Sequence, residues 1–125
     1  MEEREFKRLV ADLTSSPTED GKSKLLLPAI SSLVDRGDAE SWIRIRTLSQ
    51  MPENRVSLLK IPDFAVEAMR VAENGPAAIK EVAWRVLRNL ARAKENHVPL
   101  FHSSRLIEDA RKAIEHGETN EIPSI

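Results

Sequence analysis

The sequence contains no cysteine and no tyrosine, and aromatic residues make up only 4% of its 125 residues. Without cysteine the chain has no disulfide framework, no thiolate nucleophile and no zinc site with cysteine ligands. Because aromatic residues are few, the hydrophobic content of 41% is supplied mainly by Leu, Ile, Val and Ala, as expected for packed helices. A chain of this length is expected to form one compact body with a modest core.

A charge surplus and a long apolar run are also lacking. The formal net charge is −1, so we expect no overall attraction to nucleic acid or to an anionic membrane, and recognition by charge must come from local asymmetry. The first residues, Met1–Glu5, are charged and lack the apolar run of a signal peptide. No stretch approaches the apolar length that spans a bilayer. These features predict a cytoplasmic or nuclear protein that binds no membrane.

The chain aligns with itself, without a gap, when it is shifted by 42 residues. The identical pairs are Trp42 with Trp84, Arg46 with Arg88, Leu48 with Leu90, Glu53-Asn54 with Glu95-Asn96, Val56 with Val98, Leu58 with Leu100, Ala68 with Ala110, Glu73 with Glu115 and Gly75 with Gly117. Matches spread over a whole unit at this period are typical of helical solenoids. Each unit of a solenoid buries its apolar face by stacking on its neighbours, so the period indicates an extended interaction surface rather than a reaction centre.

Apolar residues recur three and four positions apart along most of the chain, which is the spacing of amphipathic helices. No segment alternates for long enough to be a strand, so the predicted fold class is all-α. The predicted helices run over Glu2–Leu13, Lys24–Arg36, Ala39–Met51, Glu53–Lys60, Ile61–Asn74, Ala78–Ala93, Glu95–Phe101 and Ser104–His116. Thr14–Gly21 is predicted as a loop, Pro28 falls near the first turn of its helix, and Gly37 is a left-handed stop.

The predicted helices group into units of a long, a short and a medium helix within a single domain, residues 1–125. Residues 1–37 form a capping helix with a degenerate first repeat, 38–75 and 76–117 are repeats, and 118–125 are a tail or the start of a truncated next repeat. Trp42 and Trp84 lie on the apolar stripes of the long helices, so both are predicted to be core residues. Cutting either back to Ala would then cost about 3–5 kcal/mol.

The segment from Ala83 to Ala91, followed by Glu95-Asn96-His97, resembles an armadillo repeat, and the segment before it repeats the leucine register and the Glu-Asn-Arg motif. The resemblance covers about residues 24–117 and implies a right-handed α-solenoid of three-helix repeats with an N-terminal capping helix. HEAT repeats are the competing assignment, but they lack the short middle helix. In the armadillo family an Asn of the long helix lines a concave groove and binds the backbone of an extended peptide. Asn89 matches that position, and Thr47 stands there one repeat earlier.

Basic residues surround Asn89 on the predicted long helix. Spacings of four, three and four place Arg85, Asn89, Arg92 and Asn96 on one helix face, and guanidinium groups bind carboxylates or phosphates. An ordinary solvated face is the alternative interpretation. We predict a groove that binds an acidic or extended segment of another protein. The predicted contact residues are Asn89, Arg85, Arg92, Arg88, Asn96, Arg46 and Thr47.

The resemblance is closer to some armadillo proteins than to others. Importin-α-like members carry a groove tryptophan where Arg85 stands here, so a receptor for nuclear localisation signals is not favoured. β-catenin-like members, whose basic grooves bind acidic extended partners, resemble this chain better.

No arrangement of residues typical of an active site is visible in the sequence. His97, His102 and His116 lack the spacing of metal ligands, and no base, nucleophile and oxyanion site come together. We therefore predict a protein that is not an enzyme and has no cofactor, no metal and no small-molecule substrate. Few aromatic residues are available to stack on bases, so nucleic-acid binding is not expected. The alternative function is an oligomerisation or structural module, or a regulatory fragment of a larger protein, that uses the exposed end of the solenoid.

Overall fold

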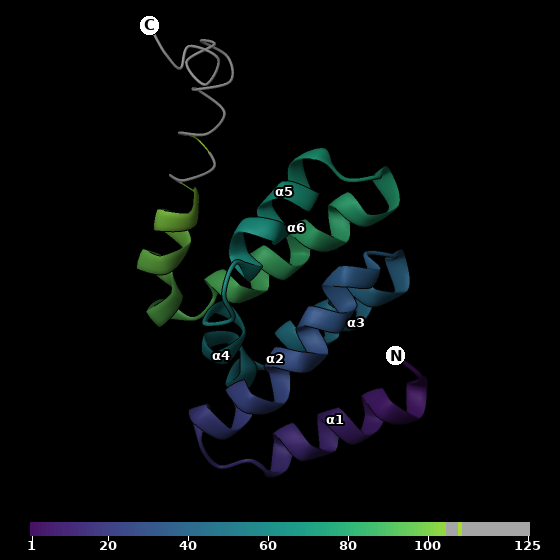
Figure 1. The fold of residues 1–125 in the computed structure, drawn as a ribbon. Helices are drawn as coiled ribbons and strands as arrows, with labels where there is room; N and C mark the ends of the chain where they lie inside the picture. The colour runs from purple at the N-terminus through teal and green to yellow at the C-terminus, as the bar shows by residue number, and fades with distance from the viewer. Residues whose placement is uncertain (105–107, 109–125) are drawn as a thin grey trace, which may run out of the picture.

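The computed structural model describes residues 1–104 and residue 108, and within this part of the chain all regular structure is helical (Figure 1). The elements are α1 (Glu3–Ser15), α2 (Glu19–Arg36), α3 (Ala39–Ser49), the 3-10 turn η1 (Pro52–Asn54), α4 (Arg55–Leu59), α5 (Phe64–Asn74), α6 (Ala77–Ala91) and the 3-10 turn η2 (Lys94–Asn96), followed by the helical residues 97–104. The predicted all-α fold class is confirmed. The predicted tail 118–125, and most of the helix predicted over Ser104–His116, lie outside the described residues.

The helices are stacked from one end of the molecule to the other. α1 packs on α2, α2 on α3 and α4, α3 on α6, and α6 on α5. α1 therefore lies at one end of the stack and the pair α5 and α6 lies toward the other (Figure 1).

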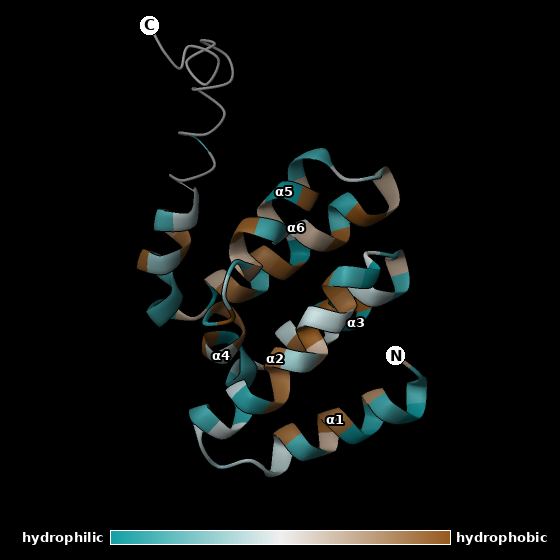
Figure 2. Ribbon diagram, in the orientation of Figure 1, coloured by the Kyte–Doolittle hydropathy of each residue, from teal (hydrophilic) through white to brown (hydrophobic). Residues whose placement is uncertain are grey.

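One continuous hydrophobic core runs through the stack, with apolar residues on the helix sides that face one another (Figure 2). Trp42 of α3 is 1% exposed and stacks on Phe64 of α5, with ring centroids 6.4 Å apart and an interplanar angle of 15°. The buried members of the core are Leu9, Leu13, Leu26, Ile30, Leu33, Trp42, Ile45, Leu48, Leu58, Ile61, Phe64, Ala68, Ala72, Ile79, Ala83, Val86, Leu87 and Leu90.

The connection between α1 and α2 is much shorter than the sequence predicts. The predicted loop Thr14–Gly21 shrinks to residues 16–18, because the Thr18 hydroxyl accepts a hydrogen bond from the Gly21 N–H (3.0 Å) and starts α2 there. Lys22 Nζ donates to the carbonyls of Leu13 (2.6 Å) and Ser16 (2.8 Å) at the end of α1, and the Leu13 carbonyl also accepts the Ser16 N–H (3.2 Å). As a result Pro28 lies inside α2 instead of near its first turn.

The junction of α2 and α3 matches the prediction. Gly37 ends α2 with φ of 65°, the left-handed conformation that glycine adopts without strain. Asp38 is the N-cap of α3, where its carboxylate accepts a hydrogen bond from the Ser41 N–H at 2.9 Å. Hydrogen bonds from the Ser41 side chain, the larger contribution, and from the Ser41 backbone lower the pKa of Asp38.

The interval of 42 residues recurs in the backbone where each long helix ends. Gln50 and Arg92 have φ/ψ of −71/−19° and −69/−20°, and the next residues, Met51 and Ala93, have −84/114° and −85/120°. Each of these pairs is followed by a three-residue 3-10 turn that begins a shorter helical segment. Local structure therefore repeats with the sequence over this segment.

Side-chain hydrogen bonds recur at the same interval. Asn54 Nδ2 donates to the Leu48 carbonyl at 3.2 Å, and Asn96 Nδ2 donates to the Leu90 carbonyl at 2.9 Å. The next residue repeats the pattern: Arg55 Nε donates to the Ser49 carbonyl at 2.9 Å, and His97 Nε2 lies 2.8 Å from the Ala91 carbonyl. The shared Glu-Asn-Arg/His motif thus supplies partners for the last carbonyls of each long helix.

The repetition ends after the short helix. α4 stops at Leu59, and a turn that includes Pro62 and Asp63, whose φ is 64°, leads the chain into α5. The equivalent residues 102–104 are helical instead. The predictions that the short helix ends at Phe101 and that a new helix begins at Ser104 are therefore wrong, because no proline interrupts the helix there.

Among the described residues, no helix has both the length and the apolar character required to cross a membrane.

Candidate binding groove

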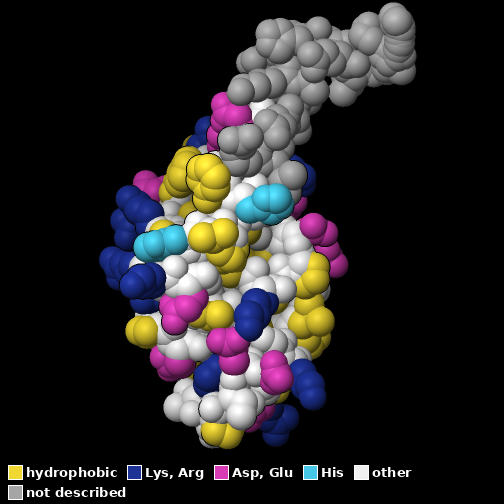
Figure 3. Space-filling model, turned by 90° about the vertical axis from the view of Figure 1, so that its left-hand side faces the viewer, with side chains coloured by type: hydrophobic (Ala, Val, Ile, Leu, Met, Phe, Trp, Pro, Cys, Tyr) yellow, Lys and Arg dark blue, Asp and Glu magenta, His cyan; other side chains and the backbone are white. Residues whose placement is uncertain are grey.

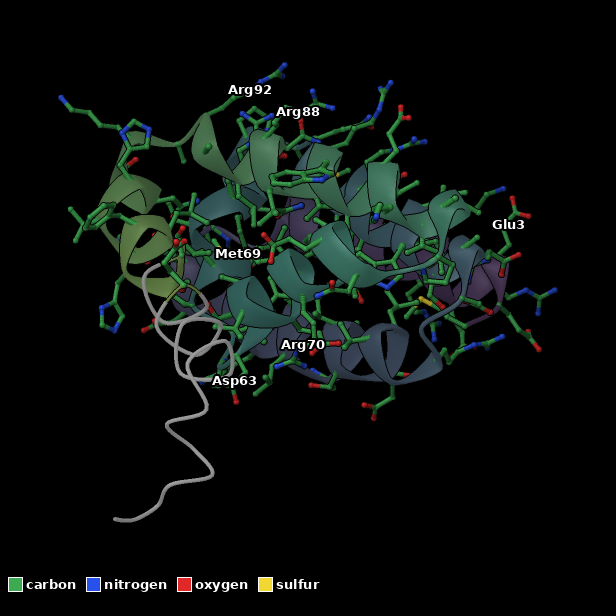
Figure 4. The ribbon with its side chains drawn as sticks, turned by 90° about the horizontal axis from the view of Figure 1, so that it is seen from above. Glu3, Asp63, Met69, Arg70, Arg88 and Arg92 are labelled. Atoms are coloured by element: carbon green, nitrogen blue, oxygen red, sulfur yellow. The ribbon has the colours of Figure 1, made fainter. Side chains whose placement is uncertain are left out.

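Five of the seven predicted contact residues line one concavity of about 430 Å³. We call it the arginine groove. Its lining residues are Arg46 of α3 with the C-cap Gln50, and Arg85, Arg88 and Asn89 of α6 with the C-cap Arg92. Figure 4 shows Arg88 and Arg92 at the same edge of the molecule, whereas Arg70 and Asp63 lie at the opposite edge.

Packing between α3 and α6 explains why residues from two repeats meet. The α6 members are spaced three and four apart, so they share one face of that helix, while Val86, Leu87 and Leu90 are buried in the core. Asn89 Nδ2 donates to the Ser49 hydroxyl at 3.0 Å and so connects the two helices across the base of the groove. The hydroxyl in turn donates to the Arg46 carbonyl at 2.7 Å. The groove is thus built on rigid elements.

The groove carries positive charge without a lining carboxylate. Arg85 pairs with Glu81 at 3.4 Å, but both side chains are exposed, so this i,i+4 pair contributes little. In the part of the chain that the structure describes, no ion pair involves Arg46, Arg88 or Arg92. The Nε atom of Arg46 is buried and has no hydrogen-bond partner there.

Two of the predicted contact residues are not in this groove. Asn96 is 2% exposed, and its amide donates to the carbonyls of Leu90 and Arg55 (3.0 Å for the latter), so the prediction that it contacts a partner is corrected. Helical spacing placed it beside Arg92, but the chain leaves α6 at Ala91 and η2 turns the residue inward. Thr47 is half-buried and donates to the Ile43 carbonyl at 3.1 Å.

Gln50 was missed by the sequence analysis. It lies four residues after Arg46, on the same helix face, so helical spacing was a signal that could have found it.

A second, apolar concavity of about 440 Å³ lies where α5, α6 and the helical residues 97–104 meet. We call it the Trp84 groove. Its apolar lining consists of Met69, Trp84, Leu87, Ala91, Leu100 and Phe101. Figure 3 shows exposed hydrophobic side chains gathered on this side of the molecule, close to basic and histidine side chains.

Trp84 does not have the buried position predicted for it. It is 47% exposed, whereas Trp42 is 1% exposed. Trp42 is covered by Phe64 of α5, which the turn at Pro62 and Asp63 places over it. Residues 102–104, which the repeat makes equivalent to Lys60–Pro62, are helical, and the residue equivalent to Phe64 lies outside the described residues.

Among the described residues, no group of three or more His, Asp or Glu side chains is arranged to hold a metal ion. Comparison of the chain with protein-family models, curated proteins and solved structures found no match. The groove geometry is therefore the basis for a functional assignment.

Proposed function

We propose that this protein is a non-enzymatic interaction module that binds an acidic, extended or helical segment of another protein in the arginine groove. The observation that carries the proposal is the convergence of Arg46, Arg85, Arg88 and Arg92 on one concavity without a lining carboxylate. The recurring backbone and hydrogen bonds at 42-residue spacing support a short armadillo-type solenoid as its scaffold.

The chemistry of the groove suits such a ligand. Each guanidinium presents donors in a planar fork that binds a carboxylate in two places. Asn89 uses one amide hydrogen on Ser49, which leaves its second amide hydrogen and its carbonyl oxygen for the main chain of an extended peptide. Because α3 and α6 are held together by packing and by this hydrogen bond, the groove loses little flexibility on binding.

A double charge reversal tests the proposal. We expect Arg85→Glu with Arg92→Glu to weaken binding of a fluorescein-labelled Asp/Glu-rich peptide by at least about tenfold, because losing charged hydrogen bonds and adding repulsion costs more than about 1.4 kcal/mol. Fluorescence anisotropy at low salt gives the affinity. Thermal unfolding is expected to stay nearly unchanged, since both side chains are exposed.

The matched control is Arg4→Glu with Arg8→Glu, which alters the net charge by the same amount on exposed positions of α1. Only the groove variant is expected to lose binding. Equal binding by the wild type and the Arg85/Arg92 variant would show that the groove is not the binding site. Equal losses in the two variants would show that only net charge matters, and would also contradict the proposal.

Self-association is a second candidate function, and the Trp84 groove favours it. Trp84 and Phe101 are 47% and 66% exposed beside a concavity with an apolar lining. An apolar surface of this kind is typical of an interaction site. The occupant we propose is a second copy of the chain, because these exposed aromatic residues lie at the end of the described stack that is opposite α1, where the same apolar face of another copy can pack on them. Light scattering over a range of concentrations tests whether the chain dimerises.

A further inference from the structure

The arginine groove gathers four arginines of two helical segments in one concavity. Four arginines line a single concavity of about 430 Å³. Arg85 and Arg88 lie on α6 and Arg92 is its C-cap, while Arg88 also lines the Trp84 groove, which contains Glu73 and Glu108. A peptide with several acidic residues would place its single charges along the groove, several ångströms apart. A set of four cations around one concavity fits a single compact group that carries more than one negative charge.

The donors of the groove also exceed what one carboxylate accepts. A carboxylate has two oxygens and one charge, whereas a phosphate monoester has three terminal oxygens and about −1.5 to −2 charges at pH 7. Arg46 lines the same concavity from α3 and adds a fourth guanidinium group to its donors. Guanidinium forks match phosphate oxygens in pairs.

We propose that the arginine groove binds a phosphorylated serine or threonine of a partner peptide, with Arg46, Arg88 and Arg92 donating to the phosphate and Asn89 holding the adjacent main chain. This inference rests on the proposed function, since it names the acidic group that the groove recognises. The groove lining contains no aromatic side chain on which a base could stack, and a phosphodiester carries only one charge, so nucleic acid fits the site less well.

Fluorescence anisotropy with three peptides tests the inference. The peptides are identical except at one position between acidic residues, which holds phosphoserine, glutamate or serine. We expect the phosphoserine peptide to bind at least about tenfold more tightly than the glutamate peptide, because of its extra charged hydrogen bonds. Equal affinity of these two peptides would overturn the inference and leave the proposed function standing. If none of the three bound, both would fail.

The pH dependence provides an independent readout. The second pKa of a phosphate monoester is about 6, so affinity for the phosphoserine peptide should fall as the pH is lowered from about 7 to about 5. Binding of the glutamate peptide should stay level over that range, because a glutamate carboxyl titrates near pH 4.3, roughly. Parallel curves for the two peptides would contradict recognition of the phosphate dianion.

NMR of the arginine Nε–H groups locates the bound phosphate. We expect the phosphoserine peptide to shift the Arg46 Nε–H signal, and Arg88→Gln to weaken binding about tenfold or more. Arg70→Gln, on the opposite edge of the molecule, is the matched control and should bind as the wild type does (Figure 4). An unshifted Arg46 signal, or inorganic phosphate or a single-stranded oligonucleotide binding as tightly as the phosphopeptide, would overturn the assignment.

Discussion

Asn54 and Asn96 occupy equivalent positions and both cap the long helix before them, but they are not equally connected. Asn54 Nδ2 reaches the Leu48 carbonyl and the Met51 sulfur at 3.1 Å, while its buried Oδ1 has no partner among the described residues. Asn96 Nδ2 donates to two carbonyls, and one of them, that of Arg55, belongs to the preceding repeat. Asn96 therefore joins the repeats to each other.

Alanine substitutions should separate these two roles. We expect Asn96→Ala to lower the free energy of unfolding by about 2–3 kcal/mol, because the hydrogen bond between the repeats and the second bond to the Leu90 carbonyl are both lost. Asn54→Ala should lower it by about 1–2 kcal/mol. Urea unfolding followed by circular dichroism gives both values. A larger loss from Asn54→Ala than from Asn96→Ala would contradict the connection between repeats that we assign to Asn96.

At the scale of elements, α2 is a helix that contains a residue, proline, that disfavours helix. Proline lacks an amide hydrogen and crowds the preceding turn, so it normally lies at a helix start. In α2, however, Leu26, Ile30 and Leu33 are all buried, at spacings of four and three, while Pro28 faces outward. Burial of that apolar stripe stabilises the helix enough to carry the proline in its interior.

Replacing this proline should stabilise the protein. We expect Pro28→Ala to raise the free energy of unfolding by about 1–3 kcal/mol. Alanine restores a helical hydrogen bond, and this gain is partly offset because alanine gives the unfolded chain more conformational entropy than proline does. Pro17→Ala, in the connection before α2, is the control and should change stability by less than about 0.5 kcal/mol. A change in urea unfolding as small as that of Pro17→Ala would contradict the cost that we assign to Pro28 inside α2.

At the scale of the whole molecule, the two ends of the stack differ. The N-terminal end is closed by α1, which packs on α2. At the other end, Trp84 and Phe101 remain exposed beside the Trp84 groove. Two residues that the sequence pattern makes equivalent, Trp42 and Trp84, therefore have different consequences: one stabilises the core and the other is available for an intermolecular contact.

Truncation of the two tryptophans should reveal this difference. We expect Trp42→Ala to lower the free energy of unfolding by about 3–5 kcal/mol, and Trp84→Ala to lower it by less than about 1 kcal/mol in dilute protein. In light scattering, Trp84→Ala should abolish dimerisation of the wild-type chain. Ile43→Ala, which removes an exposed apolar side chain of α3 outside the Trp84 groove, should not. A wild-type chain that stays monomeric at high concentration would contradict self-association.

Helical spacing in the sequence predicted the all-α class, the order of the helices and most of the arginine groove, because these depend on interactions between residues three or four apart. The stop at Gly37 and the face shared by Arg85, Asn89 and Arg92 follow from the same local physics. Arg46 could be added because the repeat interval relates it to Arg88.

Tertiary structure alone decided which side chains are covered. The repeat makes Trp84 equivalent to Trp42, but burial depends on whether another segment folds over a residue, and the helix through residues 102–104 does not make the turn found at Pro62 and Asp63. Asn96 likewise continues a basic helix face in the sequence, yet the end of α6 directs it to buried carbonyls. The sequence by itself determined the elements and their polar faces, since those are local. The structure decided which of these faces remain open to a partner, because that depends on contacts between residues far apart in the chain.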